Sequence, residues 1–154
     1  MVRWPAAITL SAAALLIFAC SPAGPEGVDP SVLDREIGRR IGDPLTCVLL
    51  AERGSGKIVY RYGTNTVCAR TYPGCQGQAE RTVEDLLKNF DPAAEGVAIS
   101  CPTAADGSRS VGWAAGPGAG RDLVFAAVME GQRALPGMIM TDRLASAFSA
   151  AGLE

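Results

Sequence analysis

The sequence predicts an α/β (α+β) sandwich, in which a five-stranded, mostly antiparallel sheet carries helices on both faces. The order of helical and strand-like segments is α-β-β-α-β-β-β-α. Two strand-like segments, residues 46–52 and 122–131, are apolar on both alternating sides, which is typical of strands covered on both faces. Short turns join most of the strands, and such turns connect antiparallel neighbours. We therefore expect the two terminal helices on one face of the sheet and the middle helix on the other.

The first helix is predicted to begin at Asp29 and Pro30. Asp29 can cap the helix with its carboxylate, and proline suits the first helical position. Apolar residues then recur every four positions up to Ile41, and Gly42 ends the run.

Two strands and a second helix follow. Residues 46–52 and 57–63 are strand-like and are joined by the glycine-containing turn 53–56. Thr82 resembles a helix cap, and the apolar face that follows it ends before Asp91 and Pro92.

The C-terminal half is predicted as three strands and a last helix. The strands cover residues 96–103, 110–116 and 122–131. The helix is expected to start near Thr141 and to end at Gly152.

The N-terminus predicts export. Residues 1–19 combine a basic start with an apolar run too short for an ordinary membrane span. Ile17-Phe18-Ala19-Cys20 resembles the lipobox of bacterial lipoproteins, which implies cleavage before Cys20 and lipidation of that residue. Ser21 then favours the outer membrane over the inner, by the same resemblance. An ordinary secretory signal or a retained anchor are the alternatives.

Removing residues 1–19 leaves one domain, expected at residues 31–154, after a short linker at residues 20–30. Of the 14 basic residues one lies in the removed segment, which leaves 13 against 16 acidic residues. No basic block is present, so we expect no nucleic-acid partner. The chain contains no histidine, which excludes a Ser-His-Asp triad and imidazole metal ligands. We expect neither a metal nor a cofactor.

Four cysteines remain if Cys20 is lipidated, and an even number in an exported domain predicts disulfides. Three pairings are possible. Because Pro73 and Gly74 can turn the chain back between two of the cysteines, we favour Cys68–Cys75 together with Cys47–Cys101.

The chain resembles the α/β part of the serine β-lactamases and penicillin-binding transpeptidases, in particular the class D enzymes. TCVLLAERGSGKIVYRYG resembles their first hairpin, and VCARTYPGCQGQ resembles the approach to their nucleophile. SVGWAAG, LVFAAVMEG and ASAFSAAGLE resemble their last two strands and final helix. The resemblance covers most of residues 31–154.

The catalytic groups that this resemblance implies are missing. The family's Ser-x-x-Lys uses the lysine to activate the serine. Alignment through Pro73 places Cys75 at the serine and Gln78 at the lysine. A shift by one residue places Gln76 and Ala79 there, so neither version supplies a base.

Two further elements of the family are also absent. The Lys-Thr-Gly motif should lie near Ser100-Cys101-Pro102-Thr103, where Pro102 stands in place of a cation. The helical domain would belong between the nucleophile and the third strand, where about eighteen residues lie. Cys75 is the one weak candidate for a nucleophile. Its thiolate would need a neighbouring base or cation, and Arg70 and Arg81 are the only cations close to it in sequence.

These observations argue against an enzyme. The hypothesis is an exported, non-catalytic lipoprotein that is held to the membrane by its lipid and binds an envelope protein or peptidoglycan. One alternative is residual penicillin binding or hydrolysis through Cys75 or a serine such as Ser100. Another is a structural lipoprotein whose sandwich is convergent.

Overall fold

The computed structural model describes residues 22–118 and 122–153, so the expected signal segment, residues 1–19, and Cys20 lie outside the described residues. One sheet of five strands has the order β2-β1-β5-β4-β3, and each neighbouring pair is antiparallel. The elements in chain order are α1 (Pro30–Ile41), β1 (Thr46–Glu52), β2 (Ile58–Tyr62), α2 (Asn65–Ala69), α3 (Val83–Lys88), β3 (Val97–Pro102), β4 (Ser110–Pro117), β5 (Leu123–Gly131) and α4 (Gly137–Ala150).

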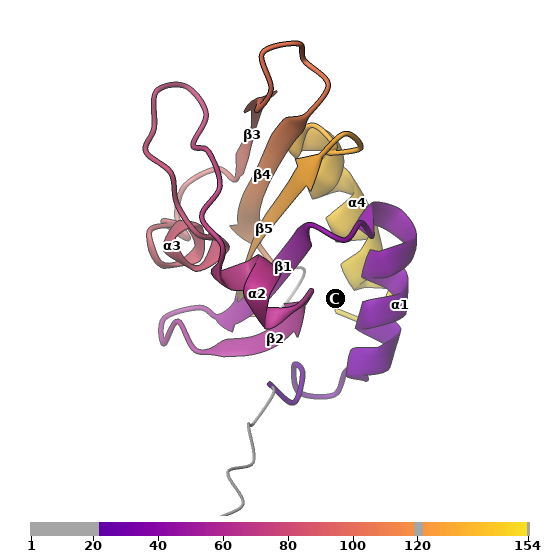
Figure 1. Ribbon diagram of the computed structural model, residues 1–154. Coiled ribbons are helices and arrows are strands. Elements are labelled where there is room, and N and C mark those ends of the chain that lie inside the picture. Colours follow the sequence, from indigo (N-terminus) through magenta and orange to yellow (C-terminus); the bar gives the residue numbers. More distant parts are fainter. Residues whose placement is uncertain (1–21, 119–121, 154) are drawn as a thin grey trace, which may run out of the picture.

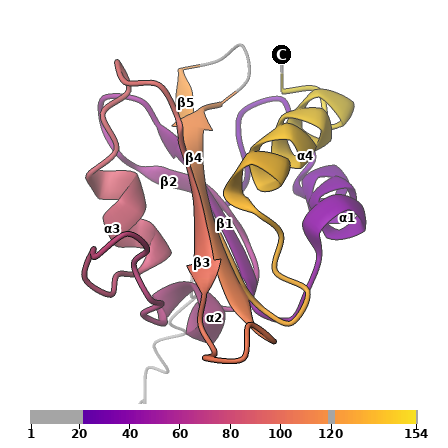
Figure 2. The same cartoon turned by 90° about the horizontal axis from the view of Figure 1, so that it is seen from above.

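Helices cover both faces of the sheet, as the sequence predicts. Helices α1 and α4 lie side by side on one face, and α3 lies on the opposite face (Figures 1 and 2). Strand β5 is buried along its whole length, and β1 is buried except at its last residue. Both therefore occupy the interior of the sheet, and the prediction of an α+β sandwich is confirmed.

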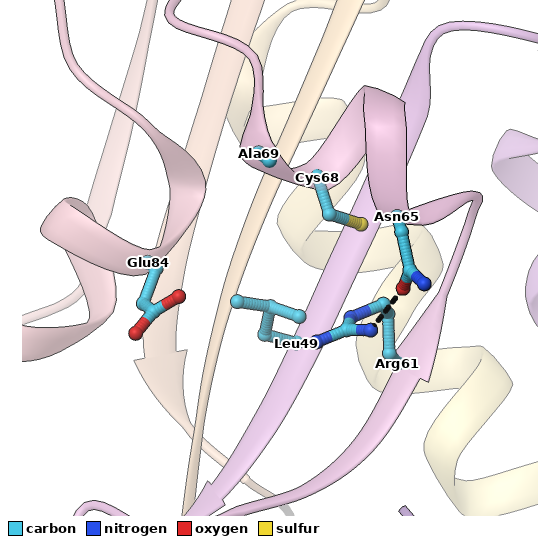
Figure 3. Close-up of a pocket in the computed structure, with 6 residues that line it drawn as sticks. All are labelled: Leu49, Arg61, Asn65, Cys68, Ala69 and Glu84. Carbon is cyan, nitrogen blue, oxygen red and sulfur yellow. Dashed lines mark hydrogen bonds between the residues drawn. The ribbon is translucent and has the colours of Figure 1, made fainter. Parts of the chain in front are cut away.

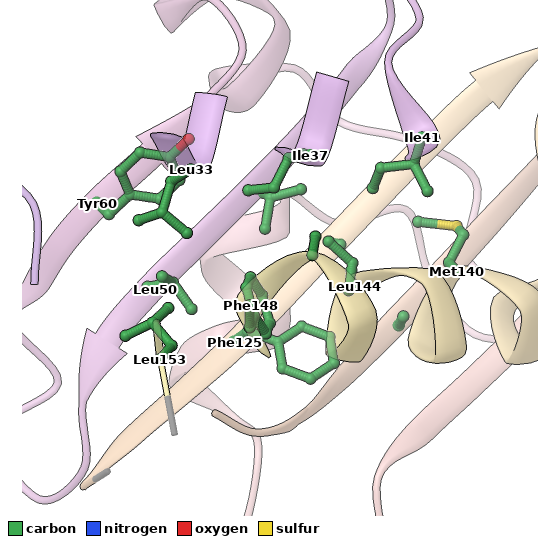
Figure 4. Packing of buried hydrophobic residues seen from close by; sticks show 14 of the residues in the cluster. Leu33, Ile37, Ile41, Leu50, Tyr60, Phe125, Met140, Leu144, Phe148 and Leu153 are labelled. Carbon is green, nitrogen blue, oxygen red and sulfur yellow. The ribbon is translucent and has the colours of Figure 1, made fainter. Parts of the chain in front are cut away.

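Each face of the sheet has its own hydrophobic core. The first lies between the sheet and the α1–α4 pair, where Leu33 and Ile37 meet Leu144 and Phe148 (Figure 4). The second lies under α2 and α3 and is built around Trp113, which is fully buried. Alternation along β1 sends Cys47, Leu49 and Ala51 into the second core and Val48 and Leu50 into the first.

Helix α1 begins as predicted. The Asp29 carboxylate accepts a hydrogen bond from the Ser31 backbone N–H at 2.8 Å, and Pro30 occupies the first helical position. Part of the segment expected as a linker packs against the domain, because the Gly24 N–H donates to Val59 O at 3.0 Å and Val28 is buried.

Two helices differ from the sequence prediction. The short helix α2 was not predicted, although Thr64 caps it by accepting a hydrogen bond from the Val67 N–H at 3.2 Å. Helix α4 begins at Gly137, one turn before Thr141, with Pro136 in the cap position and no side-chain cap bond. The sequence lacks a capping signal at that point, so the earlier start could not be read from it.

Candidate functional site

Two disulfides cross the face of the sheet that carries α2 and α3. Cys47 on β1 is bonded to Cys68 on α2, and Cys75 is bonded to Cys101 on β3. Their Cα atoms are 5.3 Å and 5.6 Å apart, within the usual range for a disulfide. Disulfides among these four cysteines were predicted, but the favoured pairing of Cys68 with Cys75 and Cys47 with Cys101 is wrong.

The unpredicted helix α2 explains the error. Cys68 lies within the helix and is directed onto β1, where it meets the buried side chain of Cys47. The chain then leaves α2 at Arg70, and the following loop carries Cys75 away toward β3. The turn at Pro73 and Gly74 exists, but it does not return the chain to Cys68.

The loop that contains Cys75 is closed by its own backbone. Tyr72 and Arg81 exchange two backbone hydrogen bonds, of 2.9 Å and 3.1 Å. Between them the Gln78 N–H donates to Cys75 O at 3.2 Å, and Gln76 and Gly77 have φ values of 58° and 77°. Positive φ at both central positions is typical of a type I′ turn. The chain thus turns back after Cys75, where the resemblance implies the start of a catalytic helix.

Aromatic and cationic side chains hold this loop on the sheet. Trp113 donates from Nε1 to Pro73 O at 3.0 Å, and its ring meets the ring of Tyr72 edge-on at 6.1 Å. The Arg81 guanidinium lies 4.9 Å from the centre of the Trp113 ring, and burial lowers the pKa of Arg81. Arg70 lies over Tyr72 in the same way, at 5.2 Å. Both arginines near Cys75 in sequence are therefore stacked on aromatic rings.

Cys75 itself is enclosed. Only 1% of Cys75 is exposed to solvent. Its sulfur is bonded to the sulfur of Cys101, so no thiol is present to form a thiolate. Ser100 is exposed on β3 and lines a shallow hollow of about 170 Å³ beside Cys101 and Pro102. None of the residues lining this hollow is a cation or a carboxylate that could activate the hydroxyl.

A larger hollow of about 330 Å³ lies between α2, α3 and the β1–β2 hairpin (Figure 3). Arg61 on β2 is the cross-strand partner of Leu49 on β1, so its side chain passes over that leucine at the floor. Asn65, at the start of α2, accepts a hydrogen bond from Arg61 Nη1. Glu84 on α3 forms the opposite wall. Cys68 and Ala69 complete the lining.

Arg61 carries a hydrogen-bond donor without a partner beside this hollow. Its Nε is buried and has no hydrogen-bond partner, and it forms no ion pair within the part of the chain that the structure describes. Glu84, by contrast, is paired with Lys88 Nζ at 2.8 Å. Sequence reasoning missed this hollow, because it depends on the register of β1 against β2 and on helix α2.

The described residues contain neither a metal-binding cluster nor a membrane-spanning helix. Among the described residues, no group of three or more His, Cys, Asp or Glu side chains is placed to hold a metal ion. Within residues 22–118 and 122–153, no helix is both long and apolar enough to cross a membrane.

No family model, curated protein or solved structure matches the chain.

Proposed function

We propose that the protein is an exported envelope lipoprotein without catalytic activity, which binds a protein or a cell-wall component on a scaffold related to the penicillin-recognising enzymes. The observation that carries this proposal is the Cys75–Cys101 disulfide. The resemblance places Cys75 at the nucleophile and Cys101 within the Lys-Thr-Gly strand. Two positions that would face each other across the family's active site are joined here by a covalent bond.

This arrangement favours binding over catalysis. A nucleophile of this family needs a free hydroxyl or thiol with a base beside it. The Cys75 sulfur is consumed by the disulfide, and the loop turns back instead of starting a helix. Without a nucleophile and a base, what remains is a rigid, two-core domain that presents its surface to a partner.

Membrane attachment would keep that surface close to the bilayer. Gly24 is hydrogen-bonded to Val59, so four residue steps separate the proposed lipidated Cys20 from the folded domain. A fully extended chain of that length reaches roughly 14 Å. The proposal therefore places the partner in the membrane, on its surface, or in the adjacent cell-wall layer.

The proposal is tested by intact-mass measurement after exposure of the purified, non-reduced protein to a fluorescent penicillin. We expect no covalent adduct, whereas a serine β-lactamase treated in parallel gives one. Thiol counting on the same sample should find Cys47, Cys68, Cys75 and Cys101 all oxidised, and a non-reducing peptide map should return the pairs 47–68 and 75–101. A stoichiometric adduct on Cys75 or Ser100, or turnover of the penicillin, contradicts the proposal.

A positive result for binding comes from capture experiments. Immobilised protein should retain peptidoglycan fragments or one envelope protein, after washing at a salt concentration that removes weak ionic contacts. Retention of neither would favour a structural lipoprotein.

A further inference from the structure

We propose that the outer surface of helices α1 and α4 docks on an anionic phospholipid membrane, with arginines contacting headgroup phosphates and exposed apolar side chains entering the interface. This inference rests on the proposed lipoprotein and deepens it, because it names a second membrane contact and the face of the domain that points away from the bilayer. The α1–α4 surface is formed by Arg35, Arg39, Arg40, Arg143, Met138 and Ile139.

Four arginines meet on this surface although they are separated in the sequence. Arg35, Arg39 and Arg40 lie on α1, and Arg143 on α4 is held beside them by a hydrogen bond from its Nη1 to Arg40 O at 2.8 Å. The side chains of Arg35 and Arg39 are 57% and 70% exposed. Their charges therefore face the solvent, where an anionic surface can reach them.

Carboxylates neutralise only part of this charge. Glu36, shared by the three arginines of α1, is the only carboxylate of the described residues within ion-pair distance of the four. Asp142 also lines the hollow between the helices, whereas Asp34 accepts a hydrogen bond from Tyr60 on the sheet. Four cations thus face two carboxylates here, and the rest of residues 20–154 carries nine cations and fourteen carboxylates. An anionic bilayer would attract this surface and repel the rest of the domain.

The hollow between α1 and α4 can admit a headgroup phosphate. Its volume is about 330 Å³, and its lining consists of Arg39, Arg40, Asp142, Arg143 and Ser146. Ser146 Oγ accepts a hydrogen bond from Arg40 Nε at 3.2 Å, so its own hydrogen can be donated to a phosphate oxygen. Arg39 and Arg143 approach the hollow from different helices, and the planar guanidinium group suits phosphate oxygens.

Exposed apolar side chains continue the same surface. Met138 and Ile139 are 68% and 38% exposed, and they are the exposed large apolar side chains of the described residues. Ile139 precedes Arg143 by four positions, and residues four apart lie on the same side of a helix. Cations beside exposed apolar side chains are typical of surfaces that lie in a membrane interface. The combination favours a bilayer over a soluble anion as the partner.

The proposed lipid anchor lies at one end of this surface. Pro22 lines a hollow together with Pro30, so the described chain enters the domain beside the first residue of α1 (Figure 1). Cys20 is two residues before Pro22, which places the lipid within roughly 7 Å of that point along an extended chain. An anchored domain therefore has the start of α1 close to the bilayer.

The apolar side chains lie at the other end. Arg143, in the first half of α4, is bonded to Arg40 near the end of α1, so Met138 is far from the anchor. Figure 2 shows the two helices side by side, with no other labelled element on their outer side. A domain lying on these helices places the arginines between the lipid and Met138. It turns α2 and α3, on the opposite face of the sheet, away from the bilayer.

The test uses the chain from residue 20 to residue 154 with Cys20→Ala, which keeps both cores and both disulfides but carries no lipid. Sedimentation measures its binding to vesicles of phosphatidylcholine alone or with about 30% phosphatidylglycerol, at about 50 mM salt. We expect about tenfold stronger binding to the anionic vesicles, although the chain as a whole is acidic, and loss of most of that binding at about 500 mM salt.

Variants assign the binding to this surface. Arg39→Gln/Arg143→Gln should weaken binding to the anionic vesicles about tenfold, and Met138→Ser about threefold. Arg70→Gln/Lys88→Gln is the matched control, because it removes the same charge from exposed positions at α2 and α3. That control should bind within about twofold of the parent chain. Native circular dichroism and cooperative urea unfolding show that each variant is folded.

A lipid with a paramagnetic headgroup identifies the docking face, because it broadens the amide NMR signals of nearby residues. We expect broadening at Arg39, Met138 and Arg143 but not at Lys88. Absence of binding, equal binding to neutral and anionic vesicles, equal loss in the two double variants, or broadening centred on α3 overturns the inference. Release by about 10 mM inorganic phosphate at constant ionic strength would also overturn it, because the surface would then be a site for free phosphate.

The inference and the proposed function can fail separately. Failure of vesicle binding, with no penicillin adduct and with capture of an envelope partner, overturns the inference while the proposed function stands. A penicillin adduct on a protein that still docks through Arg39 and Arg143 overturns the proposed function alone.

Discussion

Thr82 and Asp85 close the first turn of α3 with a reciprocal pair of hydrogen bonds. The Asp85 N–H donates to Thr82 Oγ1 at 3.0 Å, and the Thr82 N–H donates to Asp85 Oδ2 at 2.9 Å. Together they form a capping box, and the bonds from Thr82 lower the pKa of Asp85. Helix α3 has six residues, so this cap accounts for a large share of its stabilising interactions and fixes where the Cys75 loop ends.

Thr82→Ala should therefore lower the free energy of unfolding by about 1 kcal/mol, because it leaves the Asp85 N–H in the first turn of α3 without its acceptor. Equilibrium urea denaturation at neutral pH measures the change. Thr71→Ala, the same substitution at an exposed position, is the control and should alter stability by less than about 0.5 kcal/mol. A Thr82→Ala variant as stable as the control would mean that α3 is held by its core contacts alone.

The Thr82 cap could be predicted because all its partners lie within four residues. Arg61 could not be predicted as a site residue, since its significance comes from Leu49 across the hairpin and from Asn65 in an unpredicted helix. The same limit applies to the cysteines: their oxidation follows from number and compartment, whereas their pairing depends on how far α2 turns the chain.

At the scale of elements, the junction between α4 and the sheet depends on one residue without a side chain. A Cβ atom built on Gly137 would lie 2.4 Å from Trp113 O and 2.5 Å from Ile99 N. Both are backbone atoms of sheet strands, so neither can rotate away. Gly137 thus permits the first turn of α4 to rest directly on β3 and β4.

Gly137→Ala should destabilise the protein by about 3 kcal/mol, because the helix start must move away from the sheet or the strands must shift. Urea denaturation measures the loss, and the amide NMR shifts of β3 and β4 should report the displacement. Gly107→Ala separates this clash from ordinary backbone strain: its Cβ meets nothing within 4 Å, but its φ is 72°. That control should cost about 1 kcal/mol. Equal losses in the two variants would contradict the close-approach argument.

The long elements could be predicted and the short one could not. Helix α1 and strands β1 and β5 carry hydrophobic periods over enough residues to be recognised, and the bounds of β1 agree with the prediction. Helix α2 has five residues, of which only Val67 and Cys68 are buried, so its pattern is too brief to stand out. The start of α4 was placed late because Gly137 looks like a loop residue until its contact with the strands is known.

At the scale of the molecule, two adjacent strands covered on both faces organise everything else. Strands β1 and β5 are distant in sequence, yet β1 pairs with β5 along its full length in the middle of the sheet. Their double-sided apolar pattern predicted burial, but the pattern does not state which strand lies beside which, because pairing between distant strands is set by tertiary packing. The same packing buries two carboxylates, Glu36 and Glu130, and each of them is paired with an arginine.

The ionisable side chains of the described residues leave a gap in the neutral range. The chain has no histidine, and the four cysteines of the described residues are in disulfides. Hydrogen bonds lower the pKa values of four carboxyl groups, which are Asp29, Glu36, Asp85 and Asp106. Burial raises the pKa values of all three tyrosines, Tyr60, Tyr62 and Tyr72.

Stability should therefore be level between about pH 6 and pH 9 and fall on both sides. A carboxyl group with a lowered pKa stabilises the fold above its unfolded pKa, and this contribution is lost as the pH falls through the lower folded value. A tyrosine with a raised pKa stabilises the fold below its unfolded value, about 10, and this contribution is lost as the pH rises further. Urea denaturation at half-unit pH steps from about 3 to 11 measures the profile.

Tyr60 should dominate the alkaline limb. Burial is the main cause of its raised pKa, and its hydroxyl donates to Asp34 Oδ1 at 2.6 Å, where a tyrosinate would meet a carboxylate. Tyr60→Phe should lower stability at neutral pH, because the bond to Asp34 is lost, and should make the decline above about pH 10 shallower than in the parent protein. A steep change in stability between about pH 6 and pH 8 would mean that a cysteine is reduced in solution, since no other side chain of this sequence ordinarily titrates near that interval.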